Sequence, residues 1–178
     1  MKKNKILKEK NMNIGENVTI TDRSQLLSIT PEQAKKIKSL RIENQVINYE
    51  EGDDFQSLFA SLGKLDSLCF YKCVVDSFTL SSVKYTSTLR IIECDLTSDL
   101  ARGLLEHIRN WDYIDVLDLS HNRIGDTSER FFSWLLHSII GNTNIGYLIL
   151  SDNGFSEEYK AKVVSTFKDY SAYCKITF

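Results

Sequence analysis

Hydrophobic residues recur along the chain in a spacing that predicts short strands, each followed by a turn. The clearest copy has apolar residues at Leu117, Leu119 and Ile124 around the polar Asn122. Side chains alternate between the two faces of a strand, so Leu117 and Leu119 are expected to point to one side, with Asn122 in the turn that follows. Four further copies place their polar residue at Gln45, Cys73, Cys94 and Asn153.

The spacing between these copies predicts stacked units. Two incomplete copies flank the five, at Val18–Ile20 and at Tyr173–Phe178, and both are expected to form end strands. The second apolar position recurs at residues 18, 40, 68, 89, 117, 148 and 176. Units of this length cannot bury their apolar side alone, and they are stable when each covers its neighbour. The polar residues, here called the polar ladder, are expected to turn inward and to pair with backbone groups of the turns.

The segments that link the strands have apolar residues at helical period. Thr30, Pro31 and Gln33 form a capping pattern that predicts the start of a helix. Further helices are expected over residues 53–62, 98–108, 126–139 and 156–170, each opening near an Asp or Ser. Residues 76–88 are too few for a full helix and are rich in Ser and Thr, so an irregular or single-turn connection is predicted.

Over residues 17–178 the pattern resembles the leucine-rich repeat family. The frequent 28-residue spacing, with helices between strands, is similar to the ribonuclease-inhibitor-like class of that family. The resemblance implies an α/β fold, namely a short solenoid with a parallel sheet on its concave face and helices on its convex face. It also implies a module that binds another protein rather than a catalyst.

The charge and hydrophobicity of the chain argue against some classes of partner. The net charge of −2 argues against a general nucleic-acid binder, and no apolar run is long enough to span a membrane. Residues 1–16 contain five Lys and are expected to form a flexible basic arm, or to contact an acidic lipid or partner surface. No apolar core of a signal peptide follows these lysines, so we expect a cytoplasmic monomer.

The face of the predicted sheet that lacks helices, here called the open face, is the candidate binding surface. Strands in register would place its side chains in three columns: 17, 39, 67, 88, 116, 147 and 175; 19, 41, 69, 90, 118, 149 and 177; and 21, 43, 71, 92, 120 and 151. Apolar groups beside charged ones on this face suit a protein partner, although scattered exposed apolar residues are also normal. The residues expected to contact the partner are Arg41, Tyr71, Arg90, Ile92, Val116, Asp118, Tyr147 and Ile149.

The spacing of the Cys, His and acidic residues does not favour a catalytic or metal site. Cys69 and His121 are predicted to lie two strands apart, too far for a nucleophile and its base. Glu93, His121 and Asp152 would be neighbours at the rim of the sheet, where we expect a solvated cluster of charges. Cys73 and Cys94 are interpreted as stacked structural thiols; a disulfide between them is conceivable, but a reducing compartment is expected. We therefore expect no enzyme activity, no metal and no cofactor.

Two functions remain open. The first is a protein-interaction module that uses the open face. The second is a regulator of a partner enzyme, such as a GTPase, that supplies Arg90, Arg41 or Arg123 to the partner's active site. Small Lys- and Asn-rich proteins of this family also resemble effectors that intracellular bacterial pathogens deliver into the host cytoplasm, while a eukaryotic adaptor or a regulatory subunit is another setting.

Overall fold

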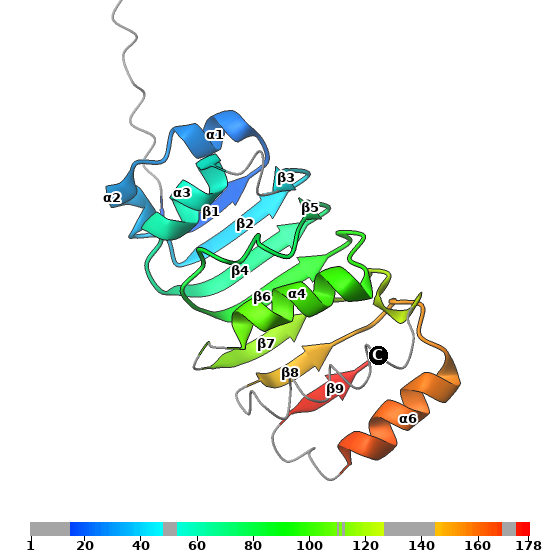
Figure 1. The fold of residues 1–178 in the computed structure, drawn as a ribbon. Helices are drawn as coiled ribbons and strands as arrows, with labels where there is room; N and C mark the ends of the chain where they lie inside the picture. Colours follow the sequence, from blue (N-terminus) through cyan, green and yellow to red (C-terminus); the bar gives the residue numbers. More distant parts are fainter. Residues whose placement is uncertain (1–14, 48–52, 110, 112, 127–144, 169–173) are drawn as a thin grey trace, which may run out of the picture.

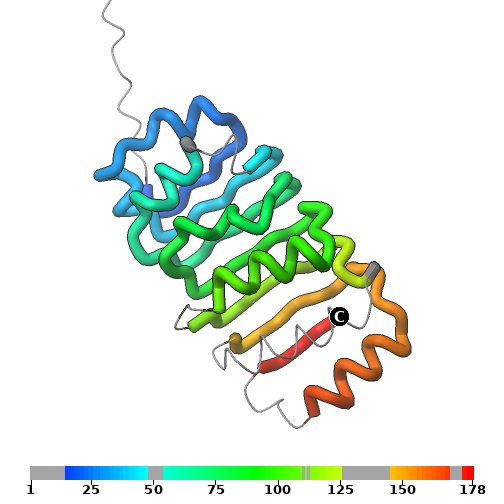
Figure 2. The backbone as a smooth tube through the Cα atoms, in the orientation of Figure 1, coloured from blue at the N-terminus to red at the C-terminus, as the bar shows by residue number. Residues whose placement is uncertain are grey.

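A seven-stranded sheet, in which every strand pair is parallel, runs through the molecule. The computed structural model describes residues 15–47, 53–109, 111, 113–126, 145–168 and 174–178. The strands are β1 (Asn17–Ile20), β2 (Ser39–Glu43), β4 (Leu65–Tyr71), β6 (Thr86–Ile92), β7 (Ile114–Asp118), β8 (Ile145–Ile149) and β9 (Lys175–Thr177). They lie side by side in chain order, as Figure 1 and the backbone tube in Figure 2 show. The prediction of an α/β fold with a parallel sheet is confirmed.

Helices connect the strands. They are α1 (Arg23–Leu27), α2 (Pro31–Ala34), α3 (Asp53–Ser61), α4 (Ser98–Ile108) and α6 (Glu157–Phe167), with a 3₁₀ turn η1 at Ile124–Asp126. A second, two-stranded parallel sheet joins β3 (Val46–Ile47) to β5 (Val74–Val75). Helices α3 and α4 lie on the same side of the large sheet, and the opposite side, which no helix in the described residues covers, is the open face (Figure 1).

Helix starts follow the capping chemistry of the sequence. Thr30 Oγ1 accepts from Gln33 N at 3.3 Å, and Gln33 Oε1 accepts from Thr30 N at 2.9 Å, so the predicted capping box forms. Ser156 caps α6 as predicted, accepting from Tyr159 N. Helix α1 was not predicted, although Asp22 and Gln25 also form a capping box. Its five residues are too few to show helical period, so only the capping pair could have revealed it.

The core lies between the sheet and the helices. Phe59 of α3 meets Phe70 of β4 edge to face, with ring centroids 6.0 Å apart. Residues 76–85 contain turns and no helix, as predicted, and Leu80 of this connection is buried in the core. Thr79 stabilises this connection, because its buried hydroxyl donates to Ile47 O at 3.0 Å.

Several predictions fall outside the described residues. These are the structure of the basic arm up to residue 14, the helix expected over 126–139 beyond its first residue, and the contribution of Tyr173 to the last strand. None of the helices in the described ranges has the length and apolar character needed to cross a membrane.

Candidate functional site

The polar ladder fixes the turns at the ends of the strands. Asn122 Nδ2 donates to the backbone oxygens of Ile91, Leu119 and Ser120 at 2.7, 2.9 and 3.0 Å. Its Oδ1 accepts from the backbone N–H groups of residues 94 and 96 at 2.9 and 3.1 Å. Asn153 repeats this pattern in the next copy of the template, and both amides are buried. The predicted inward orientation of the ladder is confirmed for these residues.

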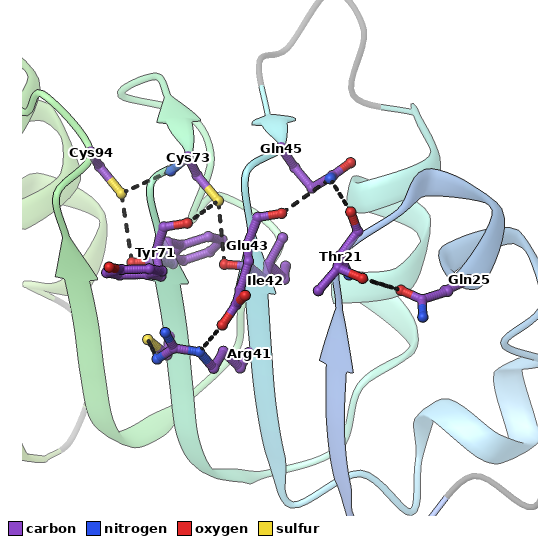
Figure 3. Close-up of polar contacts among 11 residues, drawn as sticks. Thr21, Gln25, Arg41, Ile42, Glu43, Gln45, Tyr71, Cys73 and Cys94 are labelled. Carbon is purple, nitrogen blue, oxygen red and sulfur yellow. Dashed lines mark hydrogen bonds and ion pairs between the residues drawn. The ribbon is translucent and has the colours of Figure 1, made fainter.

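Cysteines fill the ladder at the two preceding positions. Cys73 and Cys94 are free, and the backbone N–H of Cys73 donates to the Cys94 sulfur at 3.4 Å (Figure 3). Each thiol also lies against carbonyl oxygens, including those of Ile42 at 3.3 Å and Ile92 at 3.3 Å. The interaction between the two neighbouring thiols lowers the pKa of Cys73 and raises that of Cys94. The thiols therefore replace the Asn amide as small donors that pair with the turn, which supports their structural interpretation.

The residue that precedes each ladder position has a left-handed backbone. Asn44, Lys72, Glu93, His121 and Asp152 have φ between 52° and 56°, a conformation that suits a tight turn. Lys72 Nζ lies 3.4 Å from a Glu93 oxygen, and His121 Nδ1 lies 3.4 Å from an Asp152 oxygen. All five side chains are exposed. Within the described ranges, no three His, Cys, Asp or Glu residues are grouped to hold a metal ion.

Two of the three predicted columns form in full on the open face, and the third forms in part. Strand pairing aligns residues 17, 39, 67, 88, 116, 147 and 175, and in the next column 19, 41, 69, 90, 118, 149 and 177. In the third column Glu43, Tyr71 and Ile92 are in register. The sheet thus brings the eight sequence-predicted residues onto one continuous surface.

At the β2–β4 end of the open face, Arg41 is held by several partners (Figure 3). It forms an ion pair with Glu43 and donates to the Cys69 sulfur at 3.2 Å. Its guanidinium carbon lies 4.7 Å from the centre of the Tyr71 ring, and Lys72 Nζ lies 5.1 Å from the same ring. The hydrogen bond to Glu43 raises the pKa of Arg41, and burial raises that of the Cys69 thiol. At this end of the face, the charged side chains are therefore already paired with one another.

Asp118, in the middle of the face, is one of the residues predicted to contact the partner, and it is only 8% exposed. Its Oδ1 accepts from Ser120 N at 3.0 Å, which turns the carboxylate down toward the backbone, and its Oδ2 lies 4.0 Å from Arg90 Nε. Arg90 also donates to Ser67 Oγ at 3.4 Å. Asp118 therefore forms the floor of the face rather than its contact surface.

The β7–β9 end of the face is more apolar. Tyr147 is 48% exposed, and Val116 and Ile149 beside it are half-buried. Lys175 Nζ lies 5.8 Å from the centre of the Tyr147 ring. The template pattern missed Tyr113, which is 45% exposed directly before β7.

Tyr113 adds a second exposed aromatic side chain near Tyr147. Its hydroxyl donates to Asp115 Oδ1 at 2.9 Å, and this bond raises the pKa of Tyr113. Because Tyr113 precedes the first apolar position of the template, its aromatic character was the only signal in the sequence that could have identified it.

The residues considered for catalysis have separate partners. Cys69 is buried under Arg41, whereas the exposed His121 contacts Asp152. The groups that the face exposes are aromatic rings, aliphatic groups and guanidinium groups, which suit contact with another molecule.

The chain matches no model of a known protein family, and a comparison with curated proteins finds no relative.

Proposed function

We propose that the chain is a short leucine-rich repeat solenoid of the ribonuclease-inhibitor-like class that binds a partner protein through its open face. In this proposal the open face is the concave side, and the helices lie on the convex side. The support is the coincidence of three features: copies of the template along the sequence, strands in register, and buried ladder residues in the turns after β4, β6, β7 and β8, namely Cys73, Cys94, Asn122 and Asn153. Each copy then stacks on the previous one.

The exposed apolar end of the open face is the observation that carries the binding proposal. Tyr147, Val116 and Ile149 are adjacent on a side of the sheet that no described helix covers. They sit opposite the core, so folding does not need their apolar surface. At protein interfaces a few residues supply most of the binding energy, and Trp, Tyr and Arg are enriched among them.

The proposed setting is the cytoplasm, or a host cytoplasm if the chain is a delivered effector, where it acts as a monomer. If the partner is an enzyme, the chain instead regulates it by supplying an arginine. Arg41 is held by three neighbours and Arg123 pairs with Asp95 at 3.4 Å on the rim. Arg90 has the loosest contacts of the three and is the candidate for that role.

Affinity capture with a matched pair of variants tests the binding proposal. Tyr147→Ala removes an exposed ring from the open face, and Phe78→Ala removes an exposed ring from outside it. A partner captured from a lysate should bind Tyr147→Ala about 30-fold more weakly, the effect of losing about 2 kcal/mol at an anchor. Binding that is weakened by Phe78→Ala and not by Tyr147→Ala places the interface elsewhere and refutes the proposal.

A further inference from the structure

The charged side chains of the open face lie at different depths. The side chains of Arg41 and Arg90 are 40% and 42% exposed, whereas those of Glu43 and Asp118 are 24% and 12% exposed. Lys175, at the β9 end, is also exposed. The acidic groups thus form the floor and the basic groups stand above them. A partner that approaches this face meets positive charge first, although the chain as a whole is slightly acidic.

Arg90 has hydrogen-bonding capacity to spare. A guanidinium carries five N–H donors in a planar fork that matches a carboxylate. Among the described residues, Arg90 donates one hydrogen bond, to Ser67 Oγ at 3.4 Å, and its Nε lies 4.0 Å from Asp118, which is beyond hydrogen-bond distance. Arg41, in contrast, is stacked on Tyr71 and ion-paired.

The free donors of Arg90 adjoin the apolar end of the face. Along the middle column, Arg90 is followed by Asp118 and then by Ile149, and Val116 and Tyr147 occupy the column beside it. If an acidic side chain of a partner bound Arg90, the adjacent residues of that partner would therefore lie over Val116, Ile149 and Tyr147. Asp118 repels a partner carboxylate less strongly than its place in the sequence suggests, because its own carboxylate accepts a hydrogen bond from a backbone N–H.

We infer that the open face takes a protein segment in which a carboxylate lies next to an aliphatic side chain, with the carboxylate on Arg90 and the aliphatic group on Val116, Ile149 and Tyr147. This inference rests on the proposed function and specifies its partner. The carboxylate gains two charge-assisted hydrogen bonds from the partly exposed Arg90 guanidinium. The aliphatic group fixes its position through contact with the apolar end.

Three capped tripeptides of equal length test the inference: acetyl-Leu-Glu-Leu-amide, acetyl-Leu-Gln-Leu-amide and acetyl-Leu-Lys-Leu-amide. Binding to the full chain is followed by backbone amide shifts in two-dimensional NMR, which also locate the site. The Glu peptide should shift amides of β6, β7 and β8 and bind about fivefold more tightly than the Gln peptide, as expected for one exposed ion pair. The Lys peptide should bind most weakly, and added salt should reduce the preference for Glu.

Two arginine variants identify the group responsible. Arg90→Gln should abolish the preference for the Glu peptide, while Arg102→Gln, on the helical side in an exposed pair with Glu106, should leave it unchanged. Equal binding of all three peptides at the open face would refute the inference of an acidic partner but not the proposal that this face binds a protein. Absence of any saturable shift at β6, β7 and β8 would overturn both. The peptide comparison on the unchanged chain decides the question even if Arg90→Gln fails to fold.

Discussion

Replacing Asn122 by Ala should destabilise the fold more than any exposed Asn substitution. The amide makes five hydrogen bonds to backbone groups of residues 91, 94, 96, 119 and 120, at 2.7 to 3.1 Å. Truncation leaves two N–H groups and three carbonyl oxygens with one partner fewer, in a place where Asn122 is only 6% exposed. Buried backbone groups of this kind are almost always paired in native proteins.

The magnitude follows from the number of groups affected. A net hydrogen bond contributes about 1 kcal/mol, and an unpaired buried group costs about 1–3 kcal/mol. The five bonds do not add, because carbonyl oxygens accept elsewhere and a water molecule can enter the space left by the amide. We expect a loss of roughly 3 kcal/mol, close to the cost of leaving the two N–H groups unpaired.

Urea denaturation followed by circular dichroism measures the loss. Asn17→Ala, at an exposed position on β1, is the matched control and should leave the free energy of unfolding nearly unchanged. Asn122→Cys should be milder than Asn122→Ala, because the chain itself uses Cys at two ladder positions. If Asn122→Ala unfolds at the same urea concentration as Asn17→Ala, the amide does not hold the turns and the reasoning fails.

Three further results are expected. Gly125→Ala should lower the melting temperature, because the added Cβ would lie 2.5 Å from backbone atoms of the adjacent turn, whereas Gly15→Ala has open space and should not. Phe178→Ala should destabilise the β9 end by about 1 kcal/mol through loss of an edge-to-face ring contact with centroids 5.5 Å apart, measured by thermal unfolding. Burial raises the pKa of Tyr159 to about 12, so its contribution to stability should be complete below the ordinary pKa of 10 and should be lost as the pH rises from 10 towards 12; urea unfolding of the parent and of Tyr159→Phe across this pH range measures the loss.

The periodic part of the structure was predictable from sequence. The template fixes which strand residues face the core, and one marker in each copy fixes the register, so the columns of the open face followed directly. The inward orientation of Asn122 and Asn153 followed from the same register, because a polar residue between apolar ones must pair with the backbone. Position in a repeat pattern determines the face on which a side chain lies.

The depth of a side chain on that face was not predictable. Asp118 and Ile149 are paired in the same column of the face. Asp118 is buried because its carboxylate accepts from the backbone N–H of the residue two positions later, and the pattern gives no sign of this bond. A short acidic side chain can bond locally or extend into solvent, and its column does not distinguish the two outcomes. Tyr113 was missed for a related reason, since it lies outside the positions that the template constrains.

The two ends of the proposed binding face differ in a way that bears on affinity. At the β2–β4 end, Arg41 is already satisfied by Glu43 and Tyr71, so a partner gains little by displacing these contacts. At the β7–β9 end, Tyr147 is 48% exposed beside the half-buried Val116 and Ile149, and the turns after β7 and β8 are held by Asn122 and Asn153. Because those turns are fixed before binding, less conformational entropy is lost when a partner docks there. The energetic centre of the proposed interface therefore lies over β7 and β8, and Arg90 on β6 forms its charged edge.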